Sequence, residues 1–145
     1  MYFTPVPNRE ESSKIMAKIL LADDEEGLLF FFSKMLKSEG LEVVTAQDGE
    51  EAKEKILAEK PDVAILDIKM PKCDGFGVLE WIRKNIKEWI PIIMLTAIQD
   101  FESMKKGYSL EADHYLTKPC TKKDIIKSVK TMLSLKNIRG ENNQK

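Results

Sequence analysis

Five polar side chains stand at the ends of apolar stretches in this sequence. They are three carboxylates, a hydroxyl and an ammonium group: Asp23, Asp24, Asp67, Thr96 and Lys118. Carboxylates that lie close together raise one another's pKa unless a cation compensates their charge. Oxygen ligands without His or Cys suit a hard ion such as Mg²⁺. A carboxylate can also attack phosphorus and form an aspartyl phosphate, a reaction that depends mainly on positioning and charge neutralisation.

Asp67 closes the stretch around which the chain is organised. Val63–Leu66 is a short, unbroken apolar run between turn signals, which is typical of a strand buried on both faces. Pro71, Asp74 and Gly75 then predict a loop. Asp67 should therefore lie at the carboxyl tip of a central strand, where open α/β sheets bind their ligands. The alternative is that this aspartate only accepts hydrogen bonds from loop backbone groups.

The remaining patterns predict an α/β fold in which strand and helix alternate five times. The expected strands are 19–22, 42–46, 63–66, 91–95 and 113–117, and the expected helices are 28–36, 49–59, 76–86, 99–107 and one that begins at 121. This alternation predicts a parallel sheet covered on both faces, with right-handed crossovers. All strands of such a sheet end at one edge, so the five polar side chains should converge there.

Composition limits the possible functions. The 145 residues fit one domain, which we expect at 17–135 between a disordered leader at 1–16 and a frayed polar tail at 136–145. The net charge of −1 gives no basic field for nucleic acid or an anionic membrane. Cys73 and Cys120 lack metal-ligand spacing and predict reduced thiols in the cytoplasm.

Four motifs in order resemble the receiver domain of two-component response regulators, in particular the stand-alone receivers of chemotaxis and sporulation. They are Leu21-Ala22-Asp23-Asp24-Glu25, Leu66-Asp67-Ile68-Lys69-Met70-Pro71 with Asp74-Gly75, Leu95-Thr96-Ala97, and Tyr115-Leu116-Thr117-Lys118-Pro119. The resemblance covers residues 17–135. It implies a flavodoxin-like, doubly wound (βα)5 fold with five parallel strands in the order 2-1-3-4-5.

The resemblance also implies a set of site residues. Asp67 would be the phosphoacceptor. Asp24, Asp67 and the backbone carbonyl of Lys69 would bind Mg²⁺ or Mn²⁺, and Asp23 would act on the metal largely through water. Lys118 would form an ion pair with the phosphoryl group and a cis peptide bond with Pro119.

The same resemblance implies a switch and two kinds of partner. Thr96 and Tyr115 match the pair that rearranges on phosphorylation, with a readout on the last strand, the last helix and the helix at 99–107. A histidine kinase or a histidine phosphotransfer protein would donate the phosphoryl group, and a target protein would read the switched surface. The domain would assist its own phosphorylation and dephosphorylation without being a classical enzyme. We expect a receiver without a DNA-binding output domain, either stand-alone or cut from a longer chain.

Two further surfaces follow from position. Helical spacing predicts an inward stripe on the first helix: Leu28, Phe31, Phe32, Met35 and Leu36. Leu29 and Phe30 fall outside that stripe, so they predict a docking patch for the donor, although they could equally be scattered apolar surface residues. Lys69 and Ile98 flank the path of the hydrolytic water in the family and should tune the lifetime of the phosphate.

Two other functional classes fit the residues less well. A phosphatase with an aspartate nucleophile needs a second acid two residues later, and Lys69 occupies that position. A pseudo-receiver, which binds partners without being phosphorylated, usually lacks part of the acidic pocket. Here the pocket is complete, so a phosphorylated receiver is the interpretation that the sequence favours.

Overall fold

A computed structural model describes residues 16–97 and 112–143. The strands form one parallel sheet in the order β2-β1-β3-β4-β5. Their bounds are β1 Lys18–Ala22, β2 Glu42–Ala46, β3 Val63–Asp67, β4 Ile92–Ala97 and β5 His114–Lys118. The predicted α/β fold and strand order are confirmed.

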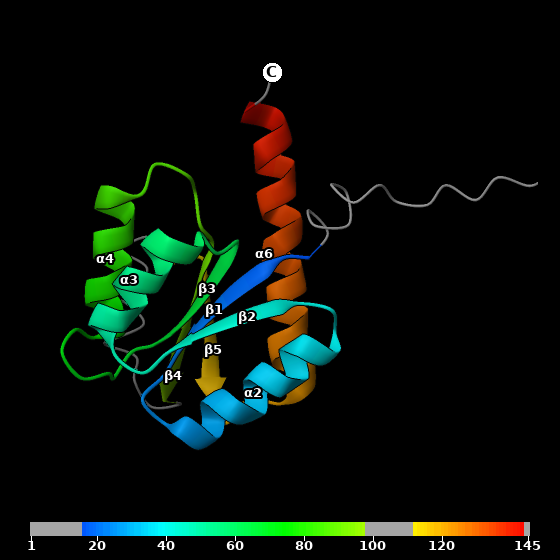
Figure 1. Cartoon of the computed structure of the whole chain (residues 1–145). Coiled ribbons are helices and arrows are strands. Elements are labelled where there is room, and N and C mark those ends of the chain that lie inside the picture. Colours follow the sequence, from blue (N-terminus) through cyan, green and yellow to red (C-terminus); the bar gives the residue numbers. More distant parts are fainter. Residues whose placement is uncertain (1–15, 98–111, 144–145) are drawn as a thin grey trace, which may run out of the picture.

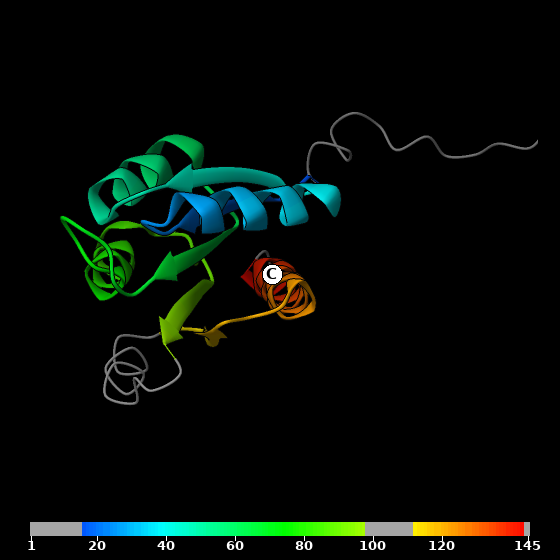
Figure 2. The same ribbon diagram turned by 90° about the horizontal axis from the view of Figure 1, so that it is seen from below.

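Helices cover both faces of this sheet, as Figures 1 and 2 show. Their bounds are α2 Glu26–Ser38, α3 Gly49–Glu59, α4 Gly75–Asn85 and α6 Lys122–Asn143. Helices α2 and α6 lie on one face, and α3 and α4 lie on the other. None of the helices described here is both long and apolar enough to cross a membrane. The predicted leader, apart from Met16, and the predicted helix at 99–107 lie outside the described residues.

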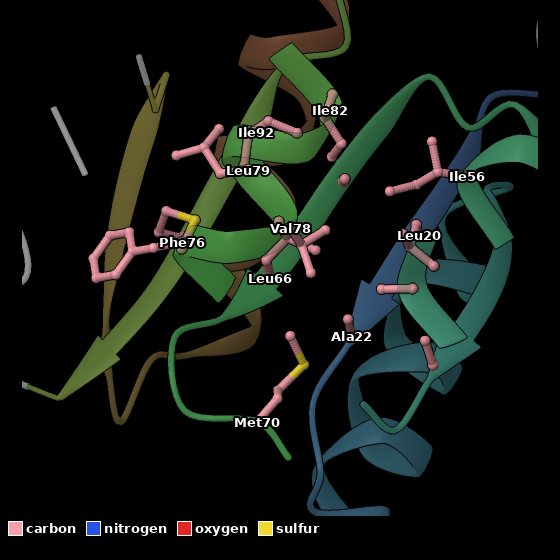
Figure 3. Packing of buried hydrophobic residues seen from close by; sticks show 14 of the residues in the cluster. Leu20, Ala22, Ile56, Leu66, Met70, Phe76, Val78, Leu79, Ile82 and Ile92 are labelled. Atoms are coloured by element: carbon pink, nitrogen blue, oxygen red, sulfur yellow. The ribbon is translucent and has the colours of Figure 1, made fainter. Parts of the chain in front are cut away.

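The alternation of side chains along each strand divides the core into two layers. In β1, Leu20 and Ala22 face α3 and α4, whereas Ile19 and Leu21 face α2 and α6. Figure 3 shows the first layer, in which the side chains of β1, β3 and β4 meet those of α3 and α4. Every residue of β3 is buried, because this strand pairs with β1 and β4 and has helices on both sides. The central position holds the tip of β3 firmly.

The phase of α2 differs from the prediction. Leu29 is 5% exposed and belongs to the core, whereas Phe31 is 60% exposed, so the expected inward and outward positions of these two residues were wrong. The apolar run Leu28–Phe32 is longer than one helical turn, so its pattern allows more than one inward face. Packing against the sheet selects the phase that buries Leu29, Phe32 and Leu36.

The last helix is longer than predicted. Helix α6 continues to Asn143 and so includes residues 136–143, which we predicted as part of a frayed tail. Lys136 forms an ion pair with Asp62 at 3.3 Å, and the guanidinium of Arg139 lies 4.4 Å from the ring centroid of Trp89. These contacts hold a polar segment in helical form against the edge of the sheet where the strands begin.

Candidate functional site

The carboxyl ends of β1, β3 and β5 bring the site residues together. Ala22 of β1 pairs with Leu66 of β3. The next residues, Asp23 and Asp67, therefore lie next to each other at the carboxyl edge of the sheet. The Nζ atom of Lys118, from the end of β5, lies 2.9 Å from Oδ2 of Asp23 and 3.3 Å from Oδ2 of Asp67. The predicted convergence of carboxylates and an ammonium group is therefore present in the fold.

The three carboxylates form a compact cluster with unequal exposure. Ligand atoms of Asp23, Asp24 and Asp67 all lie within 4.8 Å of one another. Asp23 is fully buried, Asp67 is 7% exposed and Asp24 is exposed. The two oxygens of Asp23 already accept hydrogen bonds, from the backbone N–H of Glu25 at 3.0 Å and from Lys118. Asp23 is therefore the buried, hydrogen-bonded member of the cluster, and Asp24 is the member that contacts solvent.

Burial and neighbouring charges make the ionised form of Asp67 less favourable than it is in water. Burial, followed by the charge of Asp23, raises the pKa of Asp67 to about 6, although Lys118 opposes this shift and Asp24 adds to it. Burial also disfavours the ammonium of Lys118, but the hydrogen bonds and charges of Asp23 and Asp67 outweigh it and raise the pKa of Lys118. The pocket thus holds more negative charge than its one ammonium group neutralises.

This arrangement fits a divalent cation. The donor set is made of carboxylate oxygens only, which hard ions such as Mg²⁺ prefer. A cation beside Asp24 and Asp67 would offset the charges of Asp23 and Asp24, which add to burial in raising the pKa of Asp67. Asp23 fits an indirect role, because the protein itself occupies both of its oxygens.

The chain matches a known family of signalling domains. The sequence profile of the response regulator receiver domain matches residues 19–130. This chain belongs to the response regulator receiver domain family.

Solved receiver domains have the same fold. The CheY4 chemotaxis response regulator of Vibrio cholerae is 34% identical, with a TM-score of 0.76 over 81% of this chain and 99% of that one. A CheY-like receiver domain protein of Methanospirillum hungatei JF-1 is 29% identical, with a TM-score of 0.81 over 86% of this chain and 98% of that one.

Curated relatives are transcriptional regulators. PhoP of Bacillus subtilis, named an alkaline phosphatase synthesis transcriptional regulatory protein, is 41% identical over 80% of this chain and 48% of its own length. The probable transcriptional regulator ycf27 of Guillardia theta is 44% identical over 80% of this chain and 45% of its own length. The chain spans about half the length of these relatives. Receiver domains are the phosphoacceptors of two-component signalling, not classical enzymes, and phosphorylation and Mg²⁺ binding at an acidic pocket are typical of them.

The loop after β3 is fixed by Asp74 and Gly75. The Asp74 carboxylate caps α4 by accepting a hydrogen bond from the backbone N–H of Gly77 at 2.7 Å. The N–H of Gly75 donates to the carbonyl of Ile68 at 2.8 Å, and a Cβ atom at Gly75 would overlap the carbonyl oxygen of Asp67. The sequence predicted this Asp-Gly pair as a turn and as part of a family motif, and the structure adds the close approach by which the pair positions the end of β3.

Thr96 and Tyr115 lie on one face of the receiver sheet. Met94 pairs with Tyr115, both belong to the core layer next to α3 and α4, and Thr96 follows on the same side two residues later. Thr96 is buried, and its hydroxyl donates to the carbonyl of Ala97 at 3.2 Å. The ring of Tyr115 is already buried in this structure. The Lys118–Pro119 peptide is cis, as predicted.

Three of the four remaining predicted residues belong to the described part of the chain. Lys69 is exposed and lines a cleft of about 600 Å³ together with Asp24 and Met70. Ile98 lies outside the described residues. Phe30 is 72% exposed, with the ammonium of Lys34 5.8 Å from its ring centroid, while Leu29 faces the core and cannot contact a partner. The exposed aromatic pair of α2 is therefore Phe30 and Phe31.

Proposed function

We propose that Asp67 accepts a phosphoryl group from a phosphohistidine of a histidine kinase or a histidine phosphotransfer protein. The observation that carries this proposal is the contact between the buried Asp67 carboxylate and the Lys118 ammonium, inside a cluster with Asp23 and Asp24. A carboxylate oxygen of Asp67 attacks phosphorus, the bond from phosphorus to the histidine nitrogen breaks, and the imidazole leaves. Lys118 neutralises charge on the phosphoryl oxygens, which is the main requirement of this reaction.

Asp24, Asp67 and the backbone carbonyl of Lys69 would hold Mg²⁺ or Mn²⁺, with Asp23 acting through water. When bound, the cation would supply further positive charge to the phosphoryl oxygens in addition to Lys118. The Asp67 side chain must be ionised to act as the nucleophile, and the raised pKa of Asp67 works against this. Lys118 lowers that pKa, so its ammonium serves the nucleophile as well as the incoming phosphoryl group.

Phosphorylation would then shift an equilibrium between two arrangements of Thr96 and Tyr115. The Thr96 hydroxyl, which donates to the carbonyl of Ala97 here, would turn to a phosphoryl oxygen. Rotation of the Thr96 hydroxyl would favour the arrangement in which the Tyr115 ring is buried, and the ring is buried in this structure. A differential interaction of a few kcal/mol is enough to change which state dominates. A downstream target protein would bind the favoured state at β5 and α6.

The donor would approach over the exposed face of α2, with Phe30 and Phe31 as apolar contacts. The domain would also assist loss of its own phosphate. Hydrolysis requires a water in line with the bond between Asp67 and phosphorus. Ile98 offers that water no hydrogen bond, and the exposed Lys69 beside Asp24 is a donor only. Ile98 would therefore make the phosphate persistent.

Intact mass after incubation with acetyl phosphate tests the proposal. The wild-type domain should gain the mass of one phosphoryl group when Mg²⁺ is present and should not gain it with EDTA. Asp67→Asn should abolish the gain, and Lys118→Ala should reduce its rate. Asp62→Asn is the matched control, because this aspartate lies at the opposite end of the same strand. Equal labelling of wild type and Asp67→Asn would refute the assignment of the phosphoacceptor.

A further inference from the structure

The loop after β3 contains a strained turn. The backbone φ of Lys72 is +69°, in the left-handed region that residues other than glycine adopt rarely. The N–H of Cys73 donates to the carbonyl of Pro71 at 2.7 Å, so Lys72 is the middle residue of a three-residue turn. Turns of this kind with a positive φ are strained, and they persist only where surrounding contacts hold them. This turn closely follows Lys69, whose backbone carbonyl is a ligand of the cation in the proposed function.

The connection between β2 and α3 holds this turn in place. The N–H of Gly49, the first residue of α3, donates to the carbonyl of Pro71 at 3.3 Å. The Asp48 carboxylate forms an ion pair with the ammonium of Lys72 at 3.6 Å. A Cβ atom at Gly49 would overlap the carbonyl oxygen and the Cβ atom of Cys73. Glycine is therefore the residue that lets the two segments approach this closely.

The same connection also reaches the acidic cluster. The N–H of Asp23 donates to the carbonyl of Ala46, the last residue of β2, at 3.0 Å. The Asp48 carboxylate fixes the start of α3 by accepting a hydrogen bond from the N–H of Glu51 at 2.8 Å. Residues 46–49 therefore link the tip of β1, which carries Asp23, to the loop that follows β3.

The other side of the loop borders a cleft. Lys69 and Pro71 line the cleft of about 600 Å³ that also contains Asp24. At the start of the loop, the carbonyl of Ile68 accepts a hydrogen bond from the N–H of the first residue of α4 at 2.8 Å. The Lys69 carbonyl lies between Ile68 and Pro71 in the chain, so its position depends on both of these fixed points. Gly49 supports the second of them.

We infer that Gly49 is a positioning residue for the phosphoacceptor pocket: by holding the turn at 71–73, it places the Lys69 carbonyl and so sets the affinity of the pocket for Mg²⁺. This inference rests on the proposed function and adds a residue that acts only through the loop. Groups that orient metal ligands from outside typically change metal affinity by about 10–100-fold when they are replaced. Asp24 and Asp67 belong to the strand tips, so a displaced loop should weaken the site without abolishing it.

Titration of the unphosphorylated domain with Mg²⁺, followed by backbone amide NMR, tests the inference. Gly49→Ala should raise the Mg²⁺ dissociation constant by about tenfold or more. Gly27→Ala is the matched control, because a Cβ atom at this helical glycine would meet no atom within 4 Å, and it should leave the constant unchanged. Labelling of Gly49→Ala by acetyl phosphate should need more Mg²⁺ but should approach the wild-type rate at saturating Mg²⁺.

Two variants of Lys72 separate the shape of the turn from its charge. Lys72→Gly and Lys72→Val both remove the ammonium and its ion pair with Asp48. Glycine adopts a positive φ readily, whereas the β-branched valine does not. The Mg²⁺ dissociation constant should therefore rise in Lys72→Val about as much as in Gly49→Ala and stay close to the wild-type value in Lys72→Gly. Lys72 is exposed, so this pair decides the question even if Gly49→Ala does not fold.

An unchanged dissociation constant in Gly49→Ala, an equal rise in Gly27→Ala, or equal constants in the two Lys72 variants would overturn the inference. A labelling rate of Gly49→Ala that stays low at saturating Mg²⁺ would overturn it as well, because the residue would then not act through affinity. A wild-type domain that shows the expected pattern of Mg²⁺ binding but takes no label would refute the proposed phosphoacceptor role alone, so the two failures are distinguishable.

Discussion

Replacing Asp67 with asparagine should stabilise the metal-free domain at neutral pH. The folded state raises the pKa of Asp67 to about 6 from 3.8, chiefly through burial and the charge of Asp23. As pH rises, the unfolded chain therefore loses this proton earlier than the folded chain does, so the free energy of unfolding of the wild type falls between about pH 4 and pH 6. A shift of about two pKa units corresponds to a loss of about 3 kcal/mol.

Asparagine does not titrate, so the Asp67→Asn variant should escape this loss. Its thermal midpoint at pH 7.5 should exceed that of the wild type by about 6–12 °C, since a loss of about 3 kcal/mol shifts the midpoint by about 2–4 °C per kcal/mol for a domain of this size. The difference should shrink as pH is lowered and should disappear near pH 4. Thermal unfolding followed by circular dichroism in EDTA, from pH 4 to pH 8, measures both curves.

Added Mg²⁺ provides the second half of this test. The cation should raise the midpoint of the wild type by binding the folded state, and it should have little effect on Asp67→Asn. Asp62→Asn serves as the control for the Mg²⁺ response alone: its carboxylate, which pairs with Lys136, precedes β3 at the end away from the cluster, so the midpoint of this variant should still rise with Mg²⁺. Parallel pH curves for wild type and Asp67→Asn would show that the carboxylate cluster does not strain the fold, and the electrostatic reasoning would then fail.

Three other outcomes are expected. Gly75→Ala should lower stability by about 1–3 kcal/mol in urea and slow acetyl phosphate labelling, because its Cβ overlaps the strand-end carbonyl; unchanged stability would contradict the close approach. Arg139→Ala should cost about 0.5–1 kcal/mol and speed amide exchange in the last turns of α6, whereas unaltered exchange would show that the contact with Trp89 does not hold the helix. Ile98→Glu, alone or with Lys69→Asn, should speed loss of phosphate from the purified domain, as followed by mass; a decay that is unchanged or slower would remove both residues from control of the lifetime.

The sequence predicted the pocket well because short buried strands leave a clear pattern. The three central strands, β1, β3 and β4, are compact apolar runs, and the parallel direction of the sheet fixes which end of each strand carries the polar side chain. Asp23, Asp67 and Lys118 were therefore placed correctly without knowledge of any distance between them. Their unequal burial could not be predicted, because it depends on how neighbouring strand tips shield one another.

The sequence was less informative wherever contacts distant in the chain decide the outcome. The phase of α2 depends on the sheet beneath it, because the run from Leu28 to Phe32 contains no polar residue to mark the outer side. The length of α6 depends on Asp62 and Trp89, which stand far from the helix in sequence. The local sequence of a polar segment with low helix propensity does not show whether tertiary contacts will stabilise it as a helix.

The phase of α2 has a consequence for how signalling specificity can change. Leu29 and Phe32 belong to the core, while Phe30 and Phe31 between them face outward, so positions under folding constraint and positions open to recognition interleave along one helix. The acidic pocket comes from strand tips and shares no side chain with that outer surface. Duplicated copies of such a chain could diverge at the outer positions and avoid crosstalk without passing through an unfolded or inactive intermediate. An engineer could rewire the input of this domain in the same way, by exchanging helix exteriors alone.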